Sequence, residues 1–152
     1  MKIRCHHMCH RQYHKLTLWD CGGQLSAQSL WSYHYPNTSL LVWVINIHDR
    51  SRLDSNLQLL SQTLLNPLLF QIPVLIILYN SSFHKYQQNN SDEDSNQSEL
   101  TNLEVAFRFL ATLSTSRASS FKWQVINVST DEQNRTEDLK KVRQSFRELM
   151  DL

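Results

Sequence analysis

The 152-residue sequence fits one domain that is long enough to bury a core between packed layers of helix and sheet. Apolar residues make up 41% and charged residues 19%, as in an ordinary globular chain. The formal net charge of +1 excludes the strongly basic surface field on which nucleic-acid binding depends, so no nucleic-acid partner is expected.

Glycine is the most informative residue because it is so scarce. About ten glycines would be expected in a chain of this length, whereas only two are present, the adjacent Gly22 and Gly23. A phosphate-cradling loop needs Gly-x-x-x-x-Gly-Lys-Ser/Thr and a dinucleotide loop needs three glycines, since only glycine lets backbone N–H groups approach phosphate oxygens closely. The 152 residues contain neither motif.

Targeting signals are not evident. Residues 1–11 carry Lys2, Arg4 and three histidines and lack the apolar segment of a signal peptide. The longest apolar run, residues 72–79, is too short to span a bilayer. Three cysteines give no paired disulfide framework, which favours a reducing compartment. We therefore expect a cytoplasmic protein with no membrane anchor in this chain.

Predicted strands alternate with predicted helices along the chain. Alternating or continuous apolar runs predict strands, and apolar residues spaced three and four apart predict helices. Such alternation favours a parallel sheet with right-handed crossovers. In chain order we expect a strand at 15–19, an irregular helix at 29–35, a strand buried on both faces at 40–47, a helix at 51–64, a strand at 73–79, a helix near 100–110, a strand at 122–128 and a helix from 134.

The helices are predicted in more detail from their caps and apolar faces. Ser51 and Asp54 form a possible capping box, and Glu137 is a possible capping partner for Asn134. Residues 80–98 are too hydrophilic to pack and predict a flexible insertion. The expected buried faces are Leu53, Leu57, Leu60 and Leu64; Leu100, Leu103, Phe107 and Leu110; and Leu139, Val142, Phe146 and Leu149.

One short segment carries residues suited to phosphate chemistry. Asp20 directly follows a predicted strand, and a carboxylate there is well placed to hold Mg²⁺ through a water. Gly23 can offer its backbone N–H to a terminal phosphate, and Gln24 can orient a water for in-line attack. A simple strand-to-loop turn is the alternative interpretation.

A second cluster contains thiols and imidazoles: Cys5-His6-His7-Met8-Cys9-His10, followed by His14. Such ligands can hold Zn²⁺ tetrahedrally. Successive residues of one strand point to alternate faces, however, and no second Cys/His pair lies elsewhere at a matching distance. We therefore expect no metal cluster here.

Several segments together resemble the Arf and Arf-like small GTPases over about residues 12–150. Trp19-Asp20-Cys21-Gly22-Gly23-Gln24 resembles the family's switch II signature, the most specific of the matches. The supporting segments are Leu30-Trp31 with Tyr35, Asn37-Thr38, residues 40–47, His48-Asp49-Arg50-Ser51-Arg52, Pro73-Val74-Leu75-Ile76 and Trp123-Gln124-Val125-Ile126.

The resemblance implies an α/β fold of three layers, with helices on both faces of a P-loop-GTPase-like sheet. It implies a partial Arf-like domain over 1–152 that lacks the first strand, the phosphate loop and the first helix. It also implies a GTP-binding switch in vesicle traffic, peripheral to the Golgi or other endomembranes, with GTP or GDP and Mg²⁺ as ligands.

The resemblance further assigns roles to residues of this chain. Gln24 is the expected catalytic residue, and Asp20, by way of a water, the expected Mg²⁺ residue. Trp31 and Tyr35 are expected on the surface that effectors and exchange factors bind. The expected nucleotide-binding residues are Asp20, Gly23, Asn80, Ser129 and Thr130.

The guanine-binding segment departs from the family. Where the family has Asn-Lys-x-Asp, this chain has Asn80-Ser81-Ser82-Phe83, so the base loses a lysine and a bidentate carboxylate acceptor. We therefore expect weak or absent GTP binding and impaired hydrolysis in this chain. The alternatives are a nucleotide-free pseudo-GTPase scaffold that binds a trafficking partner through switch II, and a fragment without function.

Overall fold

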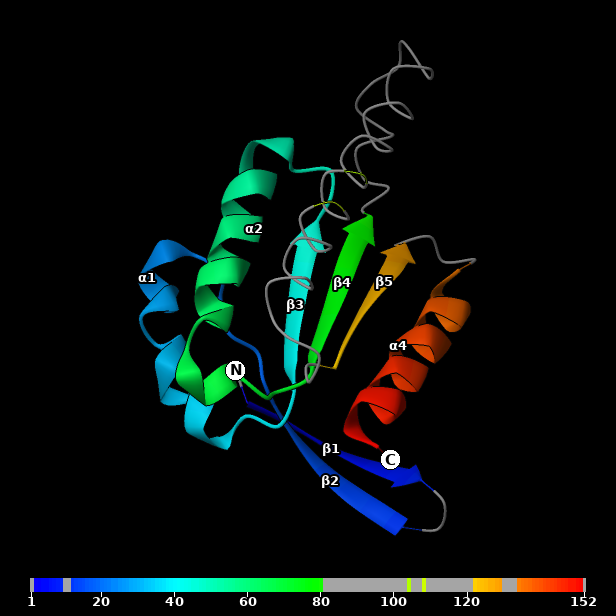
Figure 1. Cartoon of the computed structure of the whole chain (residues 1–152). Coiled ribbons are helices and arrows are strands. Elements are labelled where there is room, and N and C mark those ends of the chain that lie inside the picture. The colour runs from blue at the N-terminus through cyan, green and yellow to red at the C-terminus, as the bar shows by residue number, and fades with distance from the viewer. Residues whose placement is uncertain are drawn as a thin grey trace. The chain divides into compact units, whose positions relative to one another are not determined.

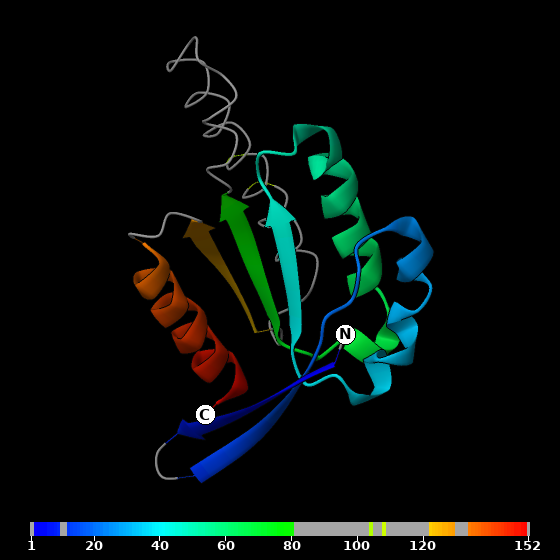
Figure 2. The same cartoon turned by 180° about the vertical axis from the view of Figure 1, so that it is seen from behind.

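The computed structural model describes residues 2–9, 12–80, 104, 108, 122–129 and 134–151. They belong to two compact units, residues 1–38 and 39–151. Figures 1 and 2 show their helices and strands from opposite sides.

The first unit begins with a hairpin. Strand β1 (Lys2–Cys9) pairs antiparallel with β2 (Gln12–Trp19) along their whole length, from Lys2 opposite Trp19 to Cys9 opposite Gln12. The predicted strand at 15–19 is thus the end of β2. The sequence pattern did not reveal β1, because its polar histidines, arginine and lysine hide any alternation.

Three short helical turns follow the hairpin. They are α1 (Leu25–Gln28), the 3₁₀ turn η1 (Trp31–Tyr33) and a second 3₁₀ turn η2 (Tyr35–Asn37). Pro36 lies in the first turn of η2, where its missing N–H costs little. The irregular helix predicted for 29–35 is confirmed.

The second unit is built on a parallel sheet. Its strands are β3 (Leu41–Asn46), β4 (Val74–Asn80) and β5 (Trp123–Ser129), and their order is β3-β4-β5 (Figure 1). Both pairings are parallel. The strands predicted at 40–47, 73–79 and 122–128 are confirmed to within one residue at each end. Parallel pairing follows because the connections are long enough to carry the chain back across the sheet.

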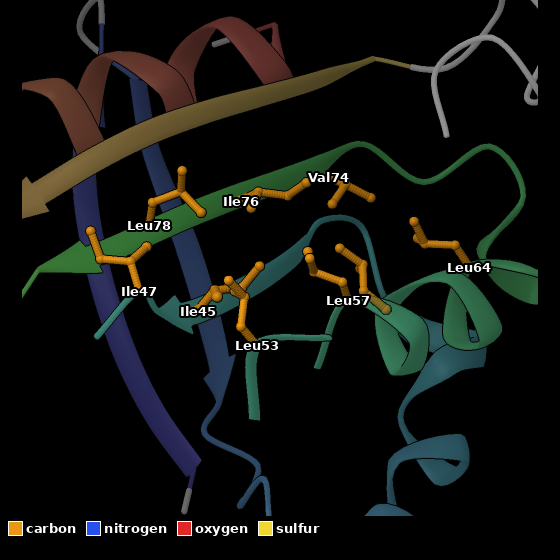
Figure 3. Packing of buried hydrophobic residues seen from close by; sticks show 9 residues of the cluster. Ile45, Ile47, Leu53, Leu57, Leu64, Val74, Ile76 and Leu78 are labelled. Atoms are coloured by element: carbon orange, nitrogen blue, oxygen red, sulfur yellow. The ribbon is translucent and has the colours of Figure 1, made fainter. Parts of the chain in front are cut away.

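Helix α2 (Arg50–Leu64) covers one face of this sheet, and the 3₁₀ turn η3 (Pro67–Leu69) follows it. Side chains from β3, β4 and α2 interdigitate in one apolar cluster, as Figure 3 shows. Leu57 is 1% exposed and Leu60 is fully buried, and every predicted core leucine of this helix is buried. The cluster consists of Ile45, Ile47, Leu53, Leu57, Leu60, Leu64, Val74, Ile76 and Leu78.

Helix α4 (Arg135–Met150) contacts β5 and β4, and Figure 3 places its ribbon on the side of the strands opposite to the apolar cluster. Leu149 is buried as predicted, and Val142 and Phe146 are half-buried. The prediction for Leu139 is wrong, since its side chain is 56% exposed. The buried positions of this helix are Asp138, Ser145 and Leu149.

Both predicted capping arrangements are wrong. Helix α2 begins one residue before Ser51 and has Asp49 at its N-cap position, so Ser51 lies inside the first turn and donates to Asp49 Oδ1 at 2.8 Å. At α4, Asn134 already has helical backbone angles, and Glu137 pairs with Lys140 instead of reaching back to the cap. A cap needs an extended backbone before the helix, which Asn134 lacks.

The prediction that β3 is buried on both faces is wrong as well. Ile45 is 1% exposed and faces α2, but its neighbour Val44 is 55% exposed. Successive side chains of a strand point to opposite faces, so among the described residues the Val44 side of β3 is less covered than the Ile45 side.

Some predictions lie outside the described residues. These include the flexible insertion after Asn80, the segment Ser81–Phe83, and the predicted core residues Leu100, Leu103, Phe107 and Leu110. Glu104 and Arg108 in that region are helical. Among the residues that the structure describes, no helix is long and apolar enough to cross a membrane.

Candidate functional site

The predicted phosphate-side residues lie in an exposed loop. Asp20 directly follows β2, and Gln24 precedes α1, so Asp20, Gly23 and Gln24 all belong to the connection between the hairpin and the first helical turn. All three are exposed to solvent. An exposed carboxylate after a strand suits Mg²⁺ held through water, because this ion keeps several of its waters in proteins.

Two side chains from the following turns hold this loop. Trp31 Nε1 donates to the carbonyl oxygen of Gly22 at 3.0 Å, and Gln28 Nε2 donates to the carbonyl oxygen of Gly23 at 3.2 Å. The carbonyls of both glycines therefore accept bonds from within the same unit. Trp31 was expected at a partner surface, and the structure adds a bond to the loop that carries Gln24.

A second tie joins the end of β2 to the helical turns. The rings of Trp19 and His34 stack with centroids 4.5 Å apart and planes at 28°. Thr38 Oγ1 donates to the carbonyl oxygen of His34 at 2.7 Å, which closes the last turn of this unit. Sequence analysis did not single out Gln28 or His34, since neither belongs to a recognisable motif; the only signal was the density of aromatic residues around them.

The two glycines have different surroundings. Neither has a positive φ, so neither is required by backbone conformation. A Cβ on Gly22 would lie 3.1 Å from Gln24 Oε1, which shows that the Gln24 carboxamide lies back over Gly22. A Cβ on Gly23 would meet no described atom within 4 Å. The space at Gly23 is therefore open to a ligand.

Part of this unit's surface is apolar. Trp19 is 48% exposed, and Tyr35 and Trp31 are half-buried. Scattered exposed apolar residues are common, but several within one short segment are typical of a protein-binding surface. The more exposed members are Leu25 at 85%, Leu30 at 55% and Tyr33 at 76%.

The predicted base-side residues lie in the second unit. Asn80 and Ser129 are the last residues of β4 and β5 and are register partners, so their backbones lie side by side at the carboxyl edge of the sheet. Ligands of open parallel sheets bind at this edge. Thr130, which follows Ser129, lies outside the described residues.

The same edge carries a polar turn after β3. Asn46 Oδ1 accepts from the backbone N–H of His48 at 3.0 Å, and the Asp49 carboxylate accepts from Ser51 and from the guanidinium of Arg52. The bond from Arg52, followed by that from Ser51, lowers the pKa of the Asp49 carboxyl below its ordinary value of 3.8. These bonds fix the start of α2 and favour the charged form of the Asp49 carboxyl group.

The candidate residues thus form two groups. Asp20, Gly23 and Gln24 belong to the first unit, and Asn80 and Ser129 belong to the second. Within the parts of the chain whose side chains the structure describes, no three His, Cys, Asp or Glu residues are grouped to hold a metal. One carboxylate is enough for Mg²⁺ when phosphate oxygens and waters complete its shell.

A parallel α/β sheet with helices and an Asp-x-Gly-Gly-Gln loop defines the class of P-loop-GTPase-like proteins. A sequence model described as the ADP-ribosylation factor family matches residues 4–146, nearly the whole chain. The chain therefore belongs to the ADP-ribosylation factor family.

A curated relative is the ADP-ribosylation factor-like protein 3 of Caenorhabditis elegans. It is 39% identical to this chain over 62 residues, which cover 41% of this chain and 34% of the relative. The matched segment thus spans about a third of that relative's length. Members of the family generally bind guanine nucleotide and Mg²⁺.

Proposed function

We propose that the protein is a guanine-nucleotide switch of the ADP-ribosylation factor type that acts in membrane traffic, peripheral to Golgi or other endomembranes. The observation that carries the proposal is the exposed Asp20–Gln24 loop, with Gly23 open to a ligand and the loop carbonyls held by Trp31 and Gln28. Membership of the family supports the choice of nucleotide.

Each loop residue has a role in this proposal. Asp20 would hold Mg²⁺ through a water, and the bound ion would supply neutralisation of the charge on the terminal phosphates. Gly23 donates its backbone N–H to the terminal phosphate, and the space that a side chain at this position would fill is open. Gln24 orients the attacking water; to do so its carboxamide swings away from Gly22, where it now lies.

Nucleotide binding by residues 1–152 is weak in this proposal. No Gly-x-x-x-x-Gly-Lys segment is present to surround the phosphates. On the base side, Asn80, Ser129 and Thr130 remain, but Phe83 stands where the family has an aspartate. A site without its charged bidentate acceptor loses most of its selectivity for guanine.

Restoring the base motif tests the base-side assignment. The double variant Ser81→Lys with Phe83→Asp should bind a fluorescent GDP analogue at least about tenfold more tightly than the wild type, since each charged bond contributes about 1.5–3 kcal/mol. Competition by GDP but not ADP should accompany the gain. Equal binding by both proteins, or equal competition by ADP, would contradict the assignment.

A second function is supported by the bonding within the loop. Trp31 and Gln28 hold the loop through hydrogen bonds from within the same unit, and apolar residues beside it are exposed. In this alternative the chain is a pseudo-GTPase scaffold that binds an effector or exchange factor through Trp31 and Tyr35, whatever its nucleotide state. Binding of such a partner that is unchanged by GTP, GDP or their removal would favour it over the switch.

A further inference from the structure

Strand β3 forms one edge of the parallel sheet in the second unit. The strand order β3-β4-β5 places β4 on one side of β3 and no described strand of this unit on the other side (Figure 1). An edge strand presents a row of backbone N–H and C=O groups that can pair with a strand of another chain. The register between β3 and β4 decides which residues present those groups.

The backbone groups of successive β3 residues point alternately toward β4 and toward the open edge. The N–H of Leu41 donates to the carbonyl oxygen of Pro73 at 3.0 Å, and Ile47 bonds in the same way to Tyr79, so the odd-numbered residues face β4. The residues whose backbone groups point to the open edge are therefore Val42, Val44 and Asn46.

Most of these edge groups have no partner among the residues that the structure describes. The exception is the Asn46 carbonyl oxygen, which accepts a long bond of 3.4 Å from the N–H of Asp49. A carbonyl oxygen has two lone pairs, so it can accept a second bond. The whole row of edge groups can therefore bond to another strand.

The sequence of β3 does not protect this edge. Natural edge strands avoid pairing with other chains by carrying charged residues or proline. The run Leu-Val-Trp-Val-Ile-Asn contains neither, and Val44 at its middle is 55% exposed. The strand thus combines free backbone groups with an exposed apolar side chain.

Two copies of this edge are complementary to one another when they run antiparallel with Val44 opposite Val44. The two Val44 residues then exchange N–H to C=O bonds, and Val42 of each copy exchanges them with Asn46 of the other. This register pairs every residue that points to the edge. It also places both Val44 side chains on the same face, with Cα atoms about 5.5 Å apart, where they cover one another.

We propose that the open edge of β3 binds the same edge of a second copy of this chain, which joins two three-stranded sheets into one continuous sheet. Because both copies use the same strand about a two-fold axis, the assembly closes at two copies. The inference does not depend on the proposed nucleotide function, since none of the residues assigned to the nucleotide belongs to β3.

The test is sedimentation equilibrium of the full chain over a range of concentrations, with residue-resolved hydrogen exchange of the same samples. A reversible dimer is expected. As it forms, exchange at the amides of Val42, Val44 and Asn46 should slow at least about tenfold, because these amides gain hydrogen bonds. Exchange at Trp43 and Ile45 should change little, since both are already bonded to β4.

Substitutions of Val44 locate the contact. Val44→Lys places like charges opposite one another across the pair, so it should weaken dimerisation at least about fivefold. Leu65→Lys is the matched control, because Leu65 is 75% exposed in the same unit but lies outside β3, and it should leave the dissociation constant unchanged.

Val44→Pro tests the backbone bonds themselves. It removes an N–H that points to the open edge and none that is bonded to β4, a position at which edge strands tolerate proline. Dimerisation should weaken about 5- to 100-fold, because the pair loses one bond from each copy. Val44→Lys carries the test if the proline variant loses its circular dichroism.

Three results would overturn the proposal. The first is a chain that stays monomeric up to millimolar concentration or grows beyond two copies. The second is a dimer in which the Val42 and Val44 amides exchange as fast as in the monomer. The third is an equal effect of Val44→Lys and Leu65→Lys on the dissociation constant.

Discussion

The indole N–H of Trp31 donates to the carbonyl oxygen of Gly22 at 3.0 Å, which joins the loop after β2 to a turn nine residues later. A neutral hydrogen bond contributes about 0.5–1.5 kcal/mol, and one near solvent lies at the lower end. This bond orders the loop that carries Asp20 and Gln24.

The variant Trp31→Phe keeps the ring and removes the donor, so the loop should open more often. Hydrogen exchange at residues 20–24 should become about two- to tenfold faster, the factor that corresponds to a bond of this strength.

Trp43→Phe is the matched control for this change. It removes a bond of 2.7 Å from Trp43 Nε1 to Asn56 Oδ1 in the second unit. Exchange should then rise around β3 and α2 and stay constant at 20–24. Unchanged loop exchange in Trp31→Phe would show that the bond does not order the loop.

The face of α4 gives a paired stability prediction. Leu149 is 4% exposed and Leu139 is 56% exposed, although the apolar pattern places both on one face. Leu149→Ala should therefore lower the free energy of unfolding by about 2–4 kcal/mol, as truncations of buried leucine do. Leu139→Ala should change it by no more than about 0.5 kcal/mol. Urea unfolding of both variants measures this, and equal losses would mean that α4 packs through the predicted face instead.

The adjacent glycines should respond differently to alanine. Gly23→Ala meets open space at an ordinary φ, so it should stabilise the loop by about 0.4–1 kcal/mol, with slower amide exchange. Gly22→Ala should stabilise the loop by a smaller amount, because the new methyl group displaces the Gln24 carboxamide.

Nucleotide binding should respond to Gly23→Ala in the opposite direction from stability. If the Gly23 N–H binds the phosphate, the new methyl group fills the open space beside it, so Gly23→Ala weakens the nucleotide binding that the chain has even though the fold tolerates the change. A Gly23→Ala variant that is less stable than the wild type would show that the glycine is kept for the fold.

Acid should weaken the turn that starts α2. The pKa of Asp49 is lowered below 3.8 by Arg52 and then Ser51, so the folded state favours the charged carboxylate. The stabilisation that the charged Asp49 gives to the folded state is therefore fully present above the ordinary pKa of 3.8, and it is lost as the pH falls through the lowered pKa of the folded state.

Asp49→Asn should consequently be slightly less stable than the wild type at neutral pH, and the difference should shrink below about pH 3.8. Urea midpoints measured across this range test the direction. Glu137→Gln removes an exposed pair at 3.4 Å and serves as the control. A difference that grows toward acid would contradict the assignment.

The strands β3, β4 and β5 were predictable because the strands of parallel sheets are typically runs rich in apolar and β-branched residues. The leucine face of α2 was predictable for a similar reason, since four leucines at spacings of four, three and four fix one stripe. The face of α4 was not. Val142 and Leu149 belong equally well to a stripe with Leu139 and to a stripe with Asp138. In the structure, where α4 contacts β4 and β5, the stripe with Asp138 is the buried one.

The site was predictable only where its residues are adjacent in sequence. Asp20, Gly23 and Gln24 form one motif, whereas the bonds from Gln28 and Trp31 depend on how the turns fold. Likewise the pairing of Asn80 with Ser129 comes from the register of β4 and β5, which no local pattern encodes.

We propose that this chain keeps the switch II loop of its family while binding nucleotide weakly. The most direct measurement is titration of residues 1–152 with a fluorescent GTP analogue, with and without Mg²⁺, while circular dichroism monitors the fold. We predict a folded protein whose binding is weaker than micromolar, about −8 kcal/mol. Mg²⁺-dependent binding that is micromolar or tighter, and lost in Asp20→Ala, would contradict the claim and require another segment of the chain to hold the phosphates.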